Sequence, residues 1–365
     1  MALVERDDGN LVFTRATSDQ IKKHFENNAQ AWAGPLAQRD YLHIHHDMLK
    51  TEANEKGSAV WVLHPPNEPL NIVSSCTTLS RPAAVNTGKG SRTVTAVIVT
   101  HIFTRPEFRG KGIATVLLTK VQNVLDSRSD VKVEFSVIYS DFQCGLYERL
   151  GWQPYRATQL RILLAKTKVE RPPNTEGLDS IELNDMPFAS DRDVDMTKTR
   201  LTGKRDGNTH ARLLATIPVV RLCIWRSKMY EHYFCKQEMA PREYGVKYVS
   251  PGTSTGAWAW WVHDFWARKL HLCRLVALRN KGMEDSVARV LEVAAAEACR
   301  CGLREVVLWE PTQQVIEGAD KLADKLGEGV RITVEDRDSN IPCLRWHGGE
   351  GREVIWEERE YYGIM

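Results

Sequence analysis

A β-branched run that passes through a glycine-containing turn into an apolar helix is the strongest constraint on the fold of this chain. Residues 93–104, TVTAVIVTHIFT, have the composition of a buried strand. Residues 112–128, GIATVLLTKVQNVLDSR, repeat apolar side chains at the helical period. The connecting stretch, RPEFRGKG, is rich in side-chain donors and poor in bulk. This pattern predicts a strand-to-helix corner that is either a bare turn or a ligand site.

The corner RGKGIA, which begins at Arg109, has the form R-x-x-G-x-A. The first amides of a helix lack intrahelical acceptors, and the helix dipole is positive there. Gly110 and Gly112 have no Cβ that would hold a diphosphate away from those amides. Ala114 keeps the next turn slim, and Arg109 and Lys111 add positive charge. We therefore favour a pyrophosphate site over a glycine turn without a ligand.

Two segments resemble the signatures of a known superfamily. VIVTHIFTRPEFRGKGIATVLL resembles motif A of the GNAT acyl-CoA-dependent N-acyltransferases, and YSDFQCGLYERLGW, residues 139–152, resembles motif B. The resemblance implies acetyl-CoA as co-substrate and a mixed sheet, flanked by helices, whose fourth and fifth strands splay to admit the pantetheine arm. By the same resemblance, the cofactor-binding residues are Ile102, Phe103, Thr104, Arg109, Gly110, Lys111, Gly112, Ile113 and Ala114.

Three residues are candidates for the acetyl-transfer chemistry. Tyr147 occupies the position of the motif B tyrosine, which the resemblance implies as the general acid toward the CoA sulfur. The alternative is a tyrosine that only packs on its helix. The strand stretch TAVIVT lacks the carboxylate that serves as base in some relatives, so His101 is the nearest candidate base and Asp141 the next. A chain of water molecules is a further alternative. Motif B departs from the family at Ser140, where many members have Asn.

A narrower resemblance links the chain to the fungal lysine N-acetyltransferases of lysine catabolism. It rests on AWAGPLAQRDYL, RPEFRGKGIA, FSVIYSDF and LYERLGW, and on a C-terminal extension of similar length. This resemblance implies free lysine as the acceptor and makes Trp32 a candidate acceptor-site residue. A lysine carboxylate requires a partner such as Arg, and its α-ammonium requires an acidic or carbonyl partner. Asp264 and Glu310 are candidates for that acidic partner, although each is also interpretable as a solvated charge.

The chain divides by composition after Ala165. We expect an α/β (α+β) fold with an N-terminal GNAT domain over residues 1–165 and a C-terminal lobe over residues 166–365. The stretch 166–187 is rich in turn residues and charge, and the strands and the long helix at 283–302 that follow repeat the layout of the first half. The segment RNKGMEDS, residues 279–286, stands where a second motif A would lie in this layout. It keeps Arg279 and Gly282 of the pattern, but Glu284 replaces Ala and would repel a pyrophosphate. We therefore expect a degenerate GNAT-like lobe that shapes the acceptor site.

Composition argues against several classes of partner. A net charge of +2 over 365 residues, with scattered basic residues, favours neither nucleic acid nor an anionic membrane. The start of the sequence lacks an apolar signal region, and no apolar run approaches the roughly 18–20 residues that span a bilayer. The eight cysteines form no C-x-x-C pair, and the histidines at 43, 45 and 46 lack partners for a ligand set. We expect reduced thiols, no metal and a cytoplasmic location.

The acceptor and the oligomeric state stay open at this point. A secondary-metabolite amine or a polyamine is an alternative acceptor for the same chemistry. A catalytically silent CoA-binding protein is the alternative from a different class. The intact corner and Tyr147 argue against that last reading.

Overall fold

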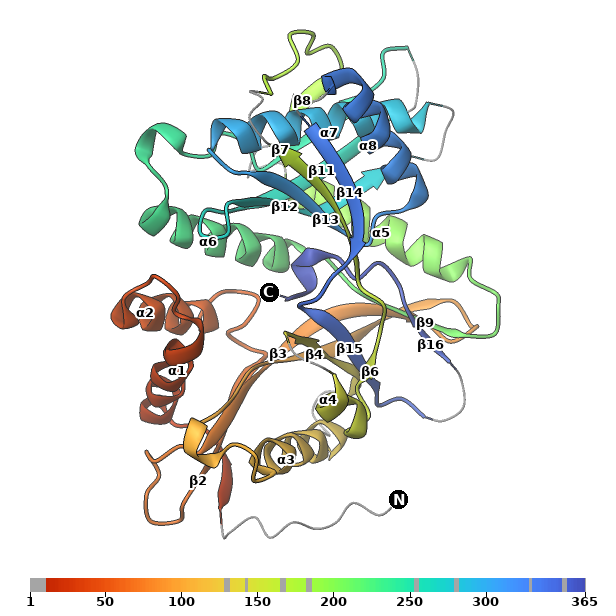
Figure 1. Ribbon diagram of the computed structural model, residues 1–365. Helices are drawn as coiled ribbons and strands as arrows, with labels where there is room; N and C mark the ends of the chain where they lie inside the picture. Colours follow the sequence, from red (N-terminus) through yellow and green to blue (C-terminus); the bar gives the residue numbers. More distant parts are fainter. Residues whose placement is uncertain are drawn as a thin grey trace. The chain divides into compact units, whose positions relative to one another are not determined.

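The computed structural model in Figure 1 describes residues 11–127, 132–141, 144–164, 169–181, 186–252, 256–278, 282–327, 330–349 and 353–364, with only the backbone of 187–189. Two mixed sheets with helices against their faces confirm the expected α/β class. The chain divides into two compact units that alternate along the sequence. The first comprises Met1–Tyr155, Lys198–Leu214 and Ser339–Glu357; the second comprises Arg156–Thr197, Ala215–Asp338 and Glu358–Met365.

The first unit is built on a sheet with the order β1-β2-β3-β4-β5-β15-β6, while β9 pairs with β3 and β16 with β9. Along this order only β4 and β5 are parallel. Its elements are β1 (Val12–Arg15), α1 (Ser18–Trp32), α2 (Gln38–Leu49), β2 (Ser58–His64), β3 (Ser74–Asn86), β4 (Ser91–Thr104), the 3₁₀ turn η1 (Pro106–Phe108), α3 (Ile113–Ser127), β5 (Val133–Ser140), α4 (Gly145–Arg149), β6 (Gln153–Pro154), β9 (Thr209–Leu213), β15 (Ile341–Trp346) and β16 (Val354–Trp356).

Apolar side chains on opposite faces of this sheet hold its helices. One face packs Val97 and Val99 of β4 against Leu117 and Leu118 of α3, and the same cluster includes Cys343 of β15. On the other face, residues of β2 pack against α1 and α2. The helix α1 begins at a capping box, in which Thr17 and Gln20 each satisfy the other's backbone amide. The α3 face therefore carries the strand-to-helix corner.

The second unit is built on a sheet with the order β14-β7-β13-β12-β11-β10-β8. Its apolar core packs α7 and α8 against one face, and Figure 1 shows α6 on the opposite side of this sheet. Its elements are β7 (Thr158–Leu164), β8 (Leu178–Ser180), α5 (Met186–Thr202, which continues into the first unit), α6 (Ile217–Phe234), η2 (Gln237–Met239), β10 (Gly245–Val249), β11 (Gly256–Asp264), β12 (Lys269–Ala277), α7 (Met283–Arg300), β13 (Glu305–Trp309), α8 (Gln313–Leu326), β14 (Val330–Asp336) and η4 (Tyr361–Ile364). Within the described residues, no helix combines the length and apolar character needed to cross a bilayer.

Two details of the strands do not follow from local sequence. Residues 81–92 contain two glycines and several polar side chains, as is typical of a loop, but most of them belong to β3 and β4, and only 87–90 form the hairpin turn. The polar residues that suggested a loop have backbone partners: Arg81 donates to Ala53 O, and Asn86 accepts from the amides of Gly88 and Gly90. Strand β7 lies within residues 1–165, the span expected for the first domain, and it pairs with β13 and β14 of the second sheet.

Candidate active site

The central strand β4 leaves its parallel neighbour part-way along its length. Within the described residues, β4 pairs with β5 from Thr95–Val133 to Ile98–Val137. Its pairing with β3 continues six residues further, to Thr104 opposite Ser74. The last part of β4 is therefore held on one edge by β3, while β5 does not pair with its other edge. A backbone edge of this kind is suited to an extended ligand that carries amides of its own.

A β-bulge lies in the part of β4 that has left β5. The register with β3 shifts so that His101 and Ile102 together lie opposite Cys76. His101 has a φ of +51°, in the left-handed region that non-glycine residues rarely adopt. A bulge redirects the side chains beside it and is common next to active sites. Here it places His101 and Phe103 on the face of the sheet that carries α1 and α2, because both rings contact Trp32.

The ring of His101 lies among side chains from α1 and α2. His45 is the nearest of these, with ring centroids 5.0 Å apart, and Trp32 lies at 6.4 Å. His24 lies at 6.1 Å and bonds through both ring nitrogens to the hydroxyls of Ser75 and Thr77. Burial, reinforced by nearby His101, lowers the pKa of His24 well below its usual value. The structure thus brings the candidate base His101 and the candidate acceptor residue Trp32 together.

The position of His45 beside the candidate base was not predicted from the sequence, in which His43, His45 and His46 of α2 could not be told apart. His45 is buried against His101, whereas His43 and His46 lie at the surface beside Asp47. Helical spacing shows that His45 lies on a different face of α2 from His43 and His46, since residues three or four apart share a face. Spacing does not show which of these faces meets the sheet, and only the fold supplies that information.

The glycine corner has an open backbone. Gly110 and Gly112 have φ values of +75° and +80°, which other residues adopt only with strain. A Cβ placed on Gly110 would meet no atom within 4 Å, so space is free beside it. Arg109 lies over the ring of Phe103 and donates from Nε to Thr104 O at 2.9 Å. The amides at the start of α3 have no intrahelical acceptors, and these residues fit the diphosphate of an acyl-CoA.

Tyr147 lies on the short helix α4, which follows β5 in the sequence. Its side chain packs against the apolar cluster that joins α3 to the sheet. Burial, with smaller contributions from Cys343 and Asp141, raises the pKa of Tyr147 to about 12. The phenol therefore keeps its proton at any ordinary pH, as a proton donor must.

The remaining acidic candidates have partners within the chain. Asp141 is exposed and accepts from the amide of Asn340 at 3.2 Å. In the second unit, Asp264 accepts from the amide of Ala267 at 2.8 Å. Glu310 accepts from Arg359 at 2.6 Å and from the amide of Thr158. Each carboxylate therefore holds a local turn or strand end in addition to any role in the reaction.

The second unit repeats the arrangement of β4 and β5. Strand β12 pairs in parallel with β13 only as far as Leu272, continues against β11, and has an extra residue at Cys273. The helix α7 follows, with Gly282 before its first residue at a φ of +83° and with Glu284 and Asp285 in its first turn. Arg279 lies outside the described residues. The two carboxylates oppose an anion at this helix start.

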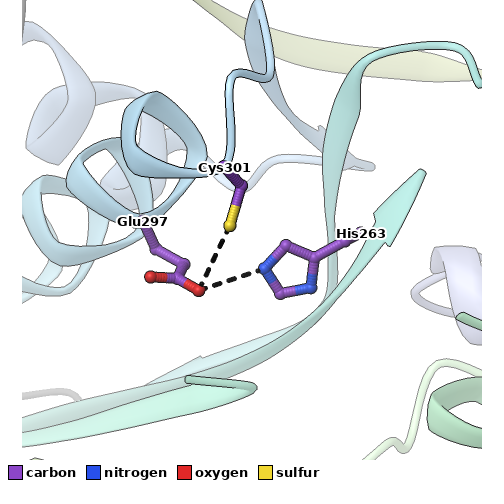
Figure 2. Close-up of side chains that lie close together, drawn as sticks. All are labelled: His263, Glu297 and Cys301. Carbon is purple, nitrogen blue, oxygen red and sulfur yellow. Dashed lines mark hydrogen bonds and ion pairs between the residues drawn. The ribbon is translucent and has the colours of Figure 1, made fainter. Parts of the chain in front are cut away.

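A buried cluster of His263, Glu297 and Cys301 in the second unit has the composition of a metal site (Figure 2). Its geometry is instead that of a hydrogen-bonded carboxylate, Glu297, with several donors around one oxygen. Glu297 Oε1 accepts from Arg300 Nη2 at 2.7 Å and from the backbone amide of Arg242 at 2.9 Å, and it lies 3.4 Å from His263 Nε2. A cation would have to displace the Arg300 guanidinium from that oxygen. We therefore assign this cluster to the packing of α7 against β11.

Comparison with known proteins supports the interpretation of both units. A model of the LYC1 GNAT-like C-terminal domain matches residues 163–365, and a model of the acetyltransferase (GNAT) domain matches residues 86–162. A probable N-acyltransferase from Enterococcus faecalis is 13% identical with a TM-score of 0.54, covering 92% of this chain and 72% of its own.

Two GCN5-related N-acetyltransferases are similar in fold as well. The protein from Anabaena variabilis is 14% identical, with a TM-score of 0.54 and coverage of 93% of this chain and 73% of its own. The protein from Kribbella flavida is 14% identical, with a TM-score of 0.51 and coverage of 92% and 71%. At these identities the likeness concerns the fold alone.

The corner, the parting of β4 from β5 and the matching domain model define a GNAT-type N-acetyltransferase that uses an acyl-CoA. The LYC1 domain model extends over more than half of the sequence. The chain belongs to the LYC1-like family of GNAT enzymes, which confirms the resemblance drawn from the sequence.

The corner makes a direct prediction for acyl-CoA affinity. Gly112→Glu places a carboxylate where the diphosphate is expected, and like charges about 4 Å apart repel by about 4 kcal/mol in a partly exposed site. We expect CoA binding, measured by isothermal titration calorimetry, to weaken by about 10²–10³-fold.

Gly90→Glu is the matched control, because Gly90 has a φ of +98° in the β3–β4 hairpin and open space around it. Both variants should lose similar thermal stability, but Gly90→Glu should bind CoA normally. A folded Gly112→Glu protein with unchanged affinity would mean that the corner is only a turn.

Proposed function

We propose that the enzyme transfers the acetyl group of acetyl-CoA to an amine of free L-lysine. The observation that carries the proposal is the LYC1-like C-terminal domain on the same chain as an open R-x-x-G-x-A corner. The resemblance to fungal lysine N-acetyltransferases in AWAGPLAQRDYL and LYERLGW supports the same acceptor. All eight cysteines are free thiols, which supports a reducing compartment such as the cytoplasm.

We assign the binding of acetyl-CoA to the two backbone features of the site. The stretch of β4 at Ile102, Phe103 and Thr104, which β5 does not pair with, would face the pantetheine arm, and the amides from Gly110 to Ala114 would face the diphosphate. Arg109 and Lys111 are exposed beside that corner and add positive charge. Bound acetyl-CoA supplies an activated thioester for transfer to the amine.

We assign proton transfer to side chains on two sides of β4. Tyr147 holds the proton that the departing thiolate needs, since its raised pKa keeps the phenol protonated. His101, redirected by the bulge, is the proposed base that removes the proton from the acceptor amine. Asp141 is a weaker candidate for the base, because its exposed carboxylate accepts from Asn340.

The acceptor would need a partner for each charged group of an amino acid. Trp32, half-buried beside His101, offers an aromatic surface for the aliphatic part. Asp264 is the acidic partner that we propose from the sequence; within the second unit, taken by itself, its charge acts on Arg226. Burial opposes the charge of Arg226, but Tyr230, Tyr361 and Asp264 outweigh it and raise the pKa of Arg226.

The acceptor assignment predicts the product of a competition assay. The full-length enzyme is incubated with acetyl-CoA and a pooled panel of amino acids, polyamines and amine metabolites, and products are identified by mass spectrometry. We expect acetyl-lysine to dominate. Acetylation of another amine with lysine untouched would contradict the acceptor, and stabilisation by acetyl-CoA without any product would favour a silent CoA-binding protein.

An Asp264→Asn variant in the same assay separates the acceptor from the cofactor. We expect a raised KM for lysine and an unchanged Kd for CoA. An unchanged KM would remove Asp264 from the acceptor site.

Tyr147→Phe tests the general acid. Loss of a positioned proton donor lowers kcat by about 10²–10⁴-fold, while the packing of the ring is kept, so the Kd for CoA should not change. Because the pKa of Tyr147 is raised to about 12, the kcat of the unmodified enzyme should not fall through loss of this proton at pH 9–10. Unchanged turnover in Tyr147→Phe would exclude the residue from the mechanism.

His101→Asn tests the base without removing the bulge, because Asn tolerates the left-handed backbone that His101 adopts. We expect kcat at neutral pH to fall by about 10²-fold and to recover partly as pH rises and more of the amine is neutral. A matched change at the neighbouring ring, His45→Asn, should affect kcat less. Equal losses in both variants would assign His101 a packing role.

A further inference from the structure

Two thiols from distant parts of the sequence meet beside the helix that carries Tyr147. Cys343 Sγ in β15 lies 3.4 Å from the Sγ of Cys144, and Cys144 is the residue that precedes α4. Both belong to the first unit, although 199 positions separate them in the chain. A disulfide requires the sulfurs at about 2.05 Å, so each atom would have to move by less than about 1 Å.

Exposure distinguishes this pair from Cys223 and Cys273, two thiols of the second unit that also share a hydrogen bond. Cys144 is half-buried, whereas Cys343 beside it is buried, so we expect a small oxidant in solvent to meet Cys144 first. In the second unit Cys273 and Cys223 are also hydrogen-bonded to each other, but both are fully buried. Burial and the bond to Cys144 raise the pKa of the Cys343 thiol, which makes it slow to react with an oxidant on its own.

We propose that Cys144 and Cys343 are a redox modification site at which hydroperoxides form a reversible disulfide. The Cys144 thiol releases its proton, and the thiolate attacks one peroxide oxygen; an S–O bond forms and the O–O bond breaks. The departing hydroxide takes up the released proton, so the products are a sulfenic acid and one molecule of water. The Cys343 sulfur then attacks the Cys144 sulfur. An S–S bond forms, the S–O bond breaks, and the departing hydroxide takes the Cys343 proton to give a second water. Two thiols are oxidised and one hydrogen peroxide is reduced.

This disulfide would act on the proposed acid. Tyr147 lies three residues after Cys144, one turn along the same element, and packs in the cluster that contains Cys343. A bond between the sulfurs would fasten the start of α4 to β15 and change the packing of the phenol. We therefore expect oxidation to lower turnover and a thiol reductant to restore it, an effect that rests on the proposed function, whereas the bond itself does not.

The test uses the full-length protein and hydrogen peroxide. After titration with peroxide, free thiols are alkylated, and the protein is digested without reductant for peptide mass spectrometry. We expect a cross-linked peptide that joins Cys144 to Cys343, about 2 Da lighter than the two thiol peptides together. It should form before any link between Cys223 and Cys273. Cys144→Ser and Cys343→Ser should each abolish it, whereas Cys223→Ser should retain it.

The result that overturns the proposal is equally direct. Progress of Cys144 to the sulfinic or sulfonic acid while Cys343 stays open to alkylation would exclude the pair, as would earlier linkage of Cys223 to Cys273. Thermal melts establish that the variants are folded, and Cys144→Ala at the half-buried position replaces any serine variant that is not. Because the cross-link is read by mass, an enzyme inactive on every amine would still test the site.

Discussion

The departure of β4 from β5 after Ile98 is the constraint on which the rest of the site depends. Strand β4 can leave its neighbour because β3 pairs with it to its end, so half of its backbone groups remain satisfied. The other edge is left for a ligand. The bulge at His101 and Ile102 lies in this same stretch, and the glycine corner follows within ten residues. Strand edge, redirected histidine and helix start thus come from one continuous segment.

The sheet that carries this segment is completed from far along the chain. Strand β15 pairs with the outer edge of β5 from Phe135 to Ser140, and β9 pairs with β3. An uncovered β5 would expose a row of unpaired backbone groups, a known liability of edge strands. The same pairing places Cys343 beside Cys144 and near Tyr147. The environment of the proposed acid is therefore shared between residues about 200 positions apart.

The two units share one arrangement of strands and helix but differ in the charge at the start of that helix. Both have a parallel strand pair that parts, an extra residue in the longer strand, and a helix that follows a glycine of positive φ. The first helix start is flanked by Arg109 and Lys111, and the second begins with Glu284 and Asp285. Lys321 bonds to Asp285 at 2.6 Å, so that carboxylate already has a cation partner. An anion is attracted to the first start and repelled from the second.

The sequence by itself determined the corner, because the glycines, the β-branched run and the helical period are local properties that act over a few residues. It likewise determined the superfamily, the α/β class and the repeated layout of the two halves. The tertiary structure alone decided which strands share a sheet. It moved 158–164 into the second unit and brought 341–346 into the first. It also decided which of three similar histidines in α2 faces His101, and that two cysteines adjoin. Pairing between distant strands depends on which edges remain open after the local elements form, and no short stretch of sequence contains that information.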